Sequence, residues 1–353
     1  MNNRIIKNRI KTIRRLLNKK KINSLLVTKP ANVTYTTAFL GADSWAVITP
    51  RAVYLLTDSR YTEQAKNECS NCRIIERTAA LPEAVGKLLK KLKSVRTVAI
   101  EKSTSLTDFE MLKKNIKGHL KSTANIIESV RSIKDSSEVA VIKAAASIAA
   151  RALRQTLRYI KPGVSENELA GVLDFQIRKL GATNSFETVV AFGPNASRPH
   201  HQPSRRKLKK RDTILIDFGA KYKGYCSDIT RCFAVGRPTT FYKKVYDVVQ
   251  QAQAAAIKRV KAGVKITHVD AAAREVIDKN DLPVYGHGTG HGLGLEIHEE
   301  PFLKADSKGR LKADQVITIE PGVYIPGKLG VRIEDDILVT KTGYQTLTHN
   351  CPH

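Results

Sequence analysis

Residues 286–301 read GHGTGHGLGLEIHEEP, a stretch in which three histidines are spaced among five glycines. The histidines are His287, His291 and His298, separated by four and seven residues. Glycine lets the backbone approach a ligand closely, and an imidazole can bind a metal or carry a proton. A glycine-rich loop with an incidental histidine would explain one such residue. Three of them, followed along the chain by the carboxylates Glu320 and Glu334, favour a functional site.

The composition is that of a globular protein. The chain has 353 residues, 42% of them hydrophobic, which is enough to bury a core and suggests about two domains. No apolar run approaches the roughly 20 residues needed to cross a bilayer, and the N-terminus lacks the apolar segment of a secretory signal. We therefore expect a cytoplasmic protein without membrane contact. The odd number of cysteines, five, favours free thiols, although Cys69 and Cys72 have the spacing of a redox or zinc site.

The net charge of +27 raises the alternative of a nucleic-acid-binding protein. Residues 1–42 contain ten Lys or Arg and no acid, and residues 205–211 form a second basic block. Neither block has interleaved aromatic residues, and aromatic residues make up only 6% of the chain, which argues against a stacking platform for single strands. A solvated basic face is therefore the favoured interpretation, and nucleic acid is not an expected partner.

Residues 1–130 are predicted to form one α/β domain. Apolar residues at helical spacing predict an amphipathic helix over residues 4–21. Further along we expect strands at 22–28, 46–56 and 96–100 and helices at 84–94 and 106–116. The only tryptophan, Trp45, falls in this domain, and the sequence does not define its role.

Residues 131–353 are predicted to contain an internal duplication. Capping boxes at Asp135/Glu138 and Ser165/Glu168 each predict the start of a helix. The order helix, Gly-Val turn, helix, strands then occurs twice, with IKPGV at 160–164 matched by VKAGV at 260–264. We expect helices at 241–261 and 269–279 and strands at 188–192, 213–218, 224–235, near Val284, 316–325 and 331–340.

Each predicted half ends in a strand pair that carries two acids, Asp217 and Asp228 in the first and Glu320 and Glu334 in the second. Burying a carboxylate in an apolar strand is costly unless it is paired or bound to metal. The four acids could pair with some of the sixty Lys and Arg residues. Together with His291, however, they would supply oxygen-rich ligation for two divalent cations, with Mn²⁺ favoured and Co²⁺, Fe²⁺ or Zn²⁺ also compatible.

Seven motifs are distributed along most of the chain, from residue 32 to residue 335. They are NVTYT at 32–36, LTDSRY at 56–61, DFGA at 217–220, YCSDITR at 225–231, GHGLG at 290–294 with IHE at 297–299, IEPGVY at 319–324 and GVRIED at 330–335. The last five resemble the pita-bread metallopeptidases, among them methionine aminopeptidase, prolidase and aminopeptidase P. The first two resemble the creatinase-like N-terminal domain of the Xaa-Pro branch, which methionine aminopeptidase lacks.

The resemblance implies an α/β (α+β) fold in two domains. Residues 1–130 would form a creatinase-like α/β domain. Residues 131–353 would form the pita-bread catalytic domain, with a pseudo-twofold antiparallel sheet and flanking helices. A homodimer is also implied.

The resemblance further implies a set of site residues. The metal ligands would be Asp217, Asp228, His291, Glu320 and Glu334, with Asp228 and Glu334 bridging both ions. The residues that contact substrate or line the site would be His200, His287, His298 and Arg332. His201, the neighbour of His200, is interpreted as a turn or surface histidine.

The function expected from this set is hydrolysis of the bond between an N-terminal residue and a following proline, as in an Xaa-Pro aminopeptidase or dipeptidase. Two cations lower the pKa of a shared water so that it can attack the peptide carbonyl. Glu320 is the candidate proton carrier, and His200 and His298 are candidates for stabilising the oxyanion. One alternative is a metal-free creatinase-like amidinohydrolase, although the intact set of five ligands argues against it. The other is the basic nucleic-acid-binding protein.

Overall fold

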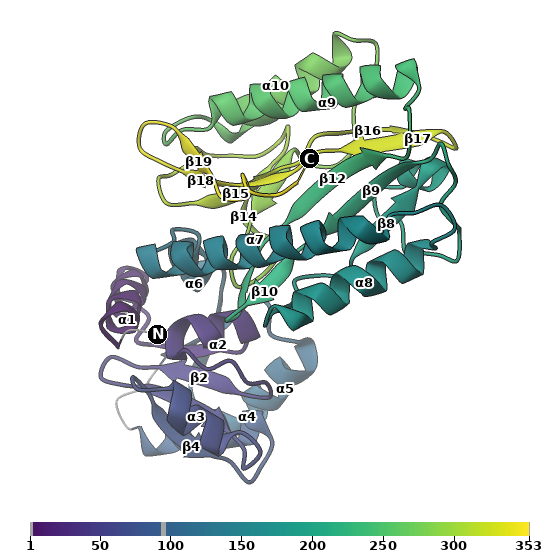
Figure 1. The fold of residues 1–353 in the computed structure, drawn as a ribbon. Coiled ribbons are helices and arrows are strands. Elements are labelled where there is room, and N and C mark those ends of the chain that lie inside the picture. Colours follow the sequence, from purple (N-terminus) through teal and green to yellow (C-terminus); the bar gives the residue numbers. More distant parts are fainter. Residues whose placement is uncertain (1–2, 93–96, 353) are drawn as a thin grey trace. The chain divides into compact units, whose positions relative to one another are not determined.

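The computed structural model describes residues 3–92 and 97–352 and divides the chain into two compact units, Met1–Arg131 and Ser132–His353 (Figure 1). The described residues include no helix that is long and apolar enough to cross a membrane. All five cysteines of the chain fall within them and carry free thiols. The end of the helix predicted at 84–94 and the start of the strand predicted at 96–100 lie outside the described residues.

The first unit is built on one mixed six-stranded sheet with the order β4-β3-β2-β1-β5-β6. The central strand β1 pairs antiparallel with β2 and parallel with β5, so its residues Leu25 and Leu26 are completely buried. The strands are β1 (Ser24–Val27), β2 (Trp45–Ile48), β3 (Val53–Thr57), β4 (Arg73–Glu76), β5 (Thr97–Glu101) and β6 (His119–Thr123). The helices are α1 (Asn3–Lys19), α2 (Pro30–Thr37), α3 (Thr62–Glu68), α4 (Leu81–Lys91), α5 (Leu106–Asn115) and α6 (Ile126–Arg131).

Helix α2 and the break between β2 and β3 were not predicted. Six consecutive residues of α2, Asn32 to Thr37, are buried, so the helix has no polar face to produce a helical period. The segment predicted as strand at 46–56 divides into β2 and β3 because the backbone N–H of Thr49 donates to the carbonyl of Ala52, which closes a turn. Strands β4 and β6 and helices α3 and α6 were also missed.

The second unit has four long helices, α7 (Ser136–Thr156), α8 (Glu166–Lys179), α9 (Thr240–Arg259) and α10 (Ile266–Asp278), and two short 3₁₀ helices, η1 (Leu157–Tyr159) and η2 (Gly193–Ser197). Both predicted capping boxes are present, Asp135 with Glu138 at α7 and Ser165 with Glu168 at α8. Helix α8 ends just before Gly181, whose φ is 85°. Glycine adopts this left-handed conformation with little strain, so it suits the end of a helix.

The strands of the second unit form two main antiparallel sheets, β12-β9-β8 and β14-β13-β15-β18-β19, and two small ones, β11-β10-β7 and β16-β17. Helices α7 and α8 cover one side of these strands, and α9 and α10 cover the other (Figure 1). The strands are β7 (Thr183–Asn184), β8 (Val189–Phe192), β9 (Thr213–Phe218), β10 (Ala220–Tyr222), β11 (Tyr225–Cys226), β12 (Ile229–Ala234), β13 (Gly290–Gly292), β14 (Glu299–Leu303), β15 (Val316–Ile319), β16 (Gly322–Ile325), β17 (Leu329–Arg332), β18 (Asp335–Val339) and β19 (Tyr344–Thr346).

The strand predicted near Val284 is wrong. This segment is irregular, and the carbonyls of Tyr285 and His287 accept hydrogen bonds from the guanidinium of Arg274 on α10, at 2.8 and 2.6 Å, in place of a strand partner. The segments predicted as single strands at 224–235 and 316–325 are each interrupted, at residues 227–228 and 320–321.

The backbone repeats itself between the two halves of this unit. The amide of Gly163 donates to the carbonyl of Leu208 at 2.8 Å, and the amide of Gly263 donates to the carbonyl of Leu311 at the same distance. In return, Leu208 and Leu311 donate to Val164 and Val264. Isolated β-bridges then join Ser165 to Lys207 and Lys265 to Arg310. The predicted duplication is therefore present in the hydrogen bonding.

Candidate active site

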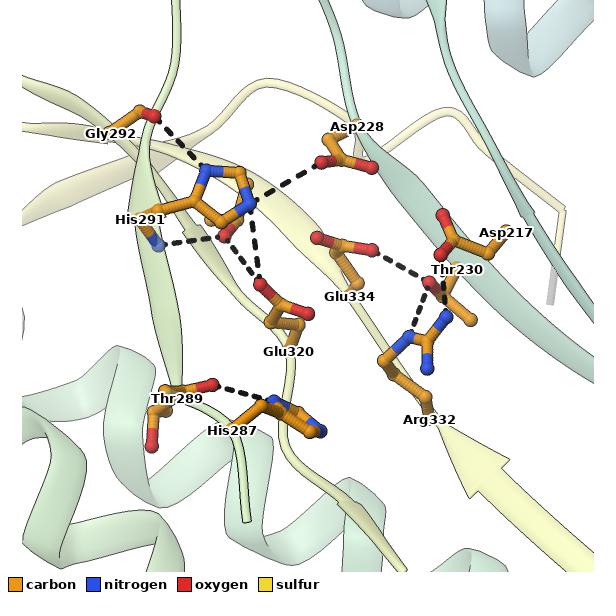
Figure 2. A network of polar contacts seen from close by, with 12 residues as sticks. Asp217, Asp228, Thr230, His287, Thr289, His291, Gly292, Glu320, Arg332 and Glu334 are labelled. Carbon is orange, nitrogen blue, oxygen red and sulfur yellow. Dashed lines mark hydrogen bonds and ion pairs between the residues drawn. The ribbon is translucent and has the colours of Figure 1, made fainter. Parts of the chain in front are cut away.

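Three of the four acids lie where strands are interrupted. Asp228 precedes β12, Glu320 follows β15 and Glu334 precedes β18, while Asp217 lies within β9. A residue outside the ladder can turn its carboxylate away from the sheet while its neighbours continue the pairing. The amide of Glu334 donates to the carbonyl of Thr230 in β12, which links the two hairpins. The four carboxylates therefore gather in one place (Figure 2).

His291 faces this group from β13. Its Nδ1 donates to the carbonyl of Gly292 at 3.0 Å, because a carbonyl oxygen can only accept. Its Nε2 lies 3.5 Å from Asp228 Oδ2 and 3.4 Å from Glu320 Oε1. Burial lowers the pKa of His291, so the neutral ring, with an unprotonated Nε2, is favoured. A lone pair is thus directed at two carboxylates, an arrangement that a cation between them would stabilise.

The carboxylates repel one another in a buried environment. Burial, followed by the charges of its neighbours, raises the pKa of Asp228 well above its usual range, and the same causes raise that of Glu334. Burial is also the main cause of the raised pKa of Glu320. The Oδ1 atom of Asp217 is buried and has no hydrogen-bond partner among the described residues. A cluster of buried carboxylates of this kind is stabilised by a cation bound between them.

A divalent cation fits these donors. One potential ligand atom from each of Asp228, His291 and Glu334 lies within 4.8 Å of the other two. Carboxylate oxygens with a single imidazole are typical ligands of divalent metal ions. Asp217 and Glu320 lie beside these three (Figure 2). The five predicted ligands therefore lie together, and their geometry and electrostatics fit a metal site.

Arg332 joins Asp217 to the rest of the site. Its guanidinium donates to Asp217 Oδ2 at 2.5 Å, to Thr230 Oγ1 at 3.1 Å and to the hydroxyl of Tyr324 at 2.8 Å. Thr230 in turn donates to Glu334 Oε2 at 2.6 Å. Burial disfavours the charged guanidinium, but Tyr324 and the surrounding acids raise the pKa of Arg332 above its usual value. Arg332 therefore offsets part of the negative charge and fixes one oxygen of Asp217.

The loop that contains His287 is held by α10. Asp270 accepts from the hydroxyl of Thr289 at 2.7 Å and from Arg274 Nε at 2.7 Å. His287 donates from Nδ1 to the carbonyl of Gly288, and its Nε2 lies 3.1 Å from the hydroxyl of Tyr324. Burial lowers the pKa of His287, so it is a neutral side chain on the wall of the site.

All nine predicted site residues line one cavity of about 460 Å³. His298 lies beside the ligand His291, with ring centroids 4.4 Å apart. Burial and the neighbouring His291 lower the pKa of His298. The nine residues are His200, Asp217, Asp228, His287, His291, His298, Glu320, Arg332 and Glu334. Side chains from segments more than 130 positions apart in the chain thus meet at one surface.

One prediction beside the site needs correction, and several residues were missed. His201 was predicted to be a turn or surface histidine, and it does end a turn, with its amide donating to the carbonyl of Arg198. It is not a surface residue, because its ring is buried and lies 2.8 Å from the carboxylate of Glu166. Tyr324 and Thr230 lie inside quoted motifs but were given no role. Phe186, Gln202, Phe302 and Lys304 also line the cavity. Phe302 could have been found from the alternation of side chains along the strand at 299–303. It pairs directly with His291 on the neighbouring strand, next to the site.

The fold and this site define a metal-dependent hydrolase. Residues 140–341 match metallopeptidase family M24, and residues 9–133 match the creatinase/prolidase N-terminal domain. Because the first match covers more than half of the chain, the protein belongs to family M24. It is therefore a hydrolase that acts on peptide bonds, and the predicted family, fold class and enzyme class are confirmed.

Three relatives illustrate the similarity. A structure of an Xaa-Pro dipeptidase from Bacillus anthracis matches with a TM-score of 0.94 and 36% identity over 98% of each chain. A structure of an X-Pro aminopeptidase from Thermotoga maritima matches with a TM-score of 0.88 and 35% identity over 95% of this chain and 97% of that one. The uncharacterized peptidase YqhT of Bacillus subtilis is 39% identical over 97% of this chain and 98% of its own length.

Proposed function

We propose that the protein hydrolyses the bond between an N-terminal residue and a following proline, using two divalent metal ions. The ions would be held by Asp217, Asp228, His291, Glu320 and Glu334, with Asp228 and Glu334 shared. The observation that carries the proposal is the convergence of these five side chains in one cavity, with an imidazole lone pair directed at carboxylates. The Xaa-Pro activities named for two similar structures support the choice of substrate.

Bound metal ions would supply Lewis-acid activation of water and of the peptide carbonyl. Glu320 lies in the same cavity, 3.4 Å from the imidazole of His291, and we assign it the transfer of a proton from the attacking water to the leaving nitrogen. When the leaving residue is proline this nitrogen is tertiary. It must receive a proton before it departs, which explains the need for a positioned acid.

His200 and His298 are assigned to the substrate. Both side chains are exposed at the cavity, so they can donate to the carbonyl oxygen as negative charge develops on it. His287 is half-buried and packs against Tyr285 and Tyr324, which suits a wall of the binding site.

The contacts favour a positioning role for Arg332. Its Nε donates to Thr230, and its two terminal nitrogens donate to Tyr324 and Asp217. We therefore assign Arg332 to orienting Asp217 and not to binding substrate.

Four further expectations from the sequence belong to this proposal. They are Mn²⁺ as the preferred ion, a homodimer, a cytoplasmic location, and the division into residues 1–130 and 131–353 as creatinase-like and catalytic domains. Elemental analysis of protein purified without added metal would test the first, and light scattering after gel filtration would test the second. Detection of the protein in fractionated cells would test the third. Expression of each segment alone would test the fourth.

The experiment that tests the activity measures release of alanine from Ala-Pro, Ala-Pro-Ala and longer peptides by protein loaded with Mn²⁺. Ala-Ala-Ala serves as the control for proline specificity. The proposal predicts cleavage after the first residue of the proline peptides. Absence of turnover with Mn²⁺, Co²⁺ and Zn²⁺ on dipeptides through pentapeptides would refute it. Undiminished turnover in protein stripped of metal would instead favour the metal-free creatinase-like alternative.

A further inference from the structure

The segment between β8 and β9 contains two adjacent histidines in opposite environments. His200 is exposed at the cavity, whereas the side chain of His201 is buried, with 6% of its surface exposed. The amide of His201 donates to the carbonyl of Arg198, which closes a turn that contains both histidines. The place of His200 therefore depends on how its buried neighbour is held.

Glu166, the first residue of α8, is the group that holds this segment. Its carboxylate is completely buried and accepts five hydrogen bonds. Two come from the start of the segment, from the amide of Phe192 at 2.7 Å and from Asn195 Nδ2 at 2.8 Å. Three come from its far end, from His201 Nε2 at 2.8 Å and from the amide and hydroxyl of Ser204 at 3.0 and 2.5 Å.

This arrangement ties both ends of the His200 segment to one charged group. A buried carboxylate is tolerated only when its oxygens are well satisfied, and here both oxygens are. Burial on its own would raise the pKa of Glu166, but hydrogen bonds from Ser204, His201 and Asn195 hold that pKa below its usual range. The side chain is therefore an anion at neutral pH, and its bonds to the segment are charge-assisted.

The second half of the unit shows that the fold does not need an acid at this position. The hydrogen bonds that define the duplication pair Ser165 with Lys265, and hence Glu166 with Ile266. Glu166 donates its amide to the carbonyl of Arg206, and Ile266 donates its amide to the carbonyl of Gly309. Ile266 begins α10 with a buried apolar side chain, 4% exposed. The buried carboxylate is thus present in the half whose segment contains His200.

We propose that Glu166 is a positioning residue that sets the location of His200 at the metal cavity, acting through His201 and Ser204. The proposal rests on the proposed function, in which His200 contacts the substrate. Glu166 itself lies behind the segment and is not assigned a contact with substrate or metal.

The first test is a double-mutant cycle with Glu166→Gln and His200→Ala, measured as kcat/KM on an Xaa-Pro peptide. Glu168→Gln is the matched control, because Glu168 lies in the same helical turn but is exposed. We expect Glu166→Gln to lower kcat/KM by about 10- to 100-fold, as small displacements of catalytic groups do. Glu168→Gln should stay within about twofold of the wild type.

The double variant, Glu166→Gln with His200→Ala, distinguishes a positioning role of Glu166 from a general structural role. If Glu166 acts through His200, Glu166→Gln will cause no further loss in a His200→Ala background, because the residue it positions is already gone. The same 10- to 100-fold loss in both backgrounds would overturn the proposal. Wild-type turnover in Glu166→Gln would overturn it as well.

A second readout needs no activity and separates failure of this proposal from failure of the proposed function. NMR of the metal-free protein with ¹³C-labelled histidine rings reports the surroundings of His200, whose signal is assigned by its loss in His200→Ala. Glu166→Gln should shift or broaden that signal, and Glu168→Gln should not. If Glu166→Gln fails to fold, Ser204→Ala removes one donor and should cause a smaller shift. An unchanged His200 signal in the folded variant would refute positioning, whatever the enzyme hydrolyses.

Discussion

Replacing Lys134 by methionine should destabilise the catalytic unit strongly. Lys134 Nζ lies 2.9 Å from Glu299 Oε2, and the two side chains are 0% and 3% exposed. Glu299 also accepts from the amide of Glu296, so the pair holds the loop that precedes β14 and contains His298. Removing one partner of a buried ion pair typically costs about 3–5 kcal/mol, because the remaining charge is buried without its counter-charge.

The expected shift is large enough to measure by thermal unfolding. In a unit of about 220 residues, 1 kcal/mol corresponds to about 2–4 °C, so the midpoint should fall by about 6–20 °C. Circular dichroism of metal-free protein would record it without a contribution from metal binding. Lys304→Met is the matched control, since the pair of Lys304 with Asp306 is exposed and such pairs contribute under about 1 kcal/mol.

A double variant isolates the charge effect. Lys134→Met combined with Glu299→Leu removes both charges, and replacing a buried pair by apolar residues is often close to neutral. It should therefore lose less stability than Lys134→Met alone. A midpoint for Lys134→Met within 2 °C of the wild type would refute the reasoning.

Three further predictions follow from the contacts of the site. Thr230→Val removes the hydroxyl that donates to Glu334, and it should weaken metal binding about 10- to 100-fold in calorimetric titration; unchanged affinity would contradict this. Gly290→Ala places a Cβ 1.9 Å from the carbonyl oxygen of Thr318, so it should separate β13 from β15 and lower the unfolding free energy by about 1–3 kcal/mol, measured in urea; wild-type stability would show that the strands can adjust. The stability gap between wild type and Glu166→Gln should be complete at pH 7 and should shrink as pH falls from about 4.3, the unfolded pKa, through the lower folded pKa. Burial would raise the folded pKa of Glu166, but its hydrogen bonds outweigh burial and lower it. Urea unfolding at pH 7 and at a series of values from about pH 4 to about pH 3 checks this, and a gap that widens in acid would contradict it.

The residues that line the cavity were recognisable in the sequence, but the breaks in the strands around them were not. Asp217 and Glu320 were recognisable because a carboxylate in an apolar strand needs a physical reason, and Asp228 and Glu334 because each lies in a strand pair with one of them. The segments that contain Asp228, Glu320 and Glu334 were predicted as unbroken strands, and the structure interrupts them at or next to these acids. These three acids lie outside the strand ladders, but apolar residues continue on both sides of each break and hide it.

Residues that act from behind the site could not be predicted. Glu166 reads as an ordinary acid in the first turn of a helix, where it suits the helix dipole. Its five hydrogen bonds depend on a segment some 30 residues away. Lys134 similarly reads as a linker residue, and its partner is 165 positions away. Such pairings depend on tertiary structure, and one sequence contains no signal for them.

The most direct measurement of the central claim is a titration of metal-free protein with Mn²⁺, followed by release of alanine from Ala-Pro-Ala. The account predicts no activity without metal, activity that saturates at two equivalents, and no recovery in His291→Ala at the same metal concentration. Full activity in metal-free protein, or wild-type metal binding and turnover in His291→Ala, would contradict it.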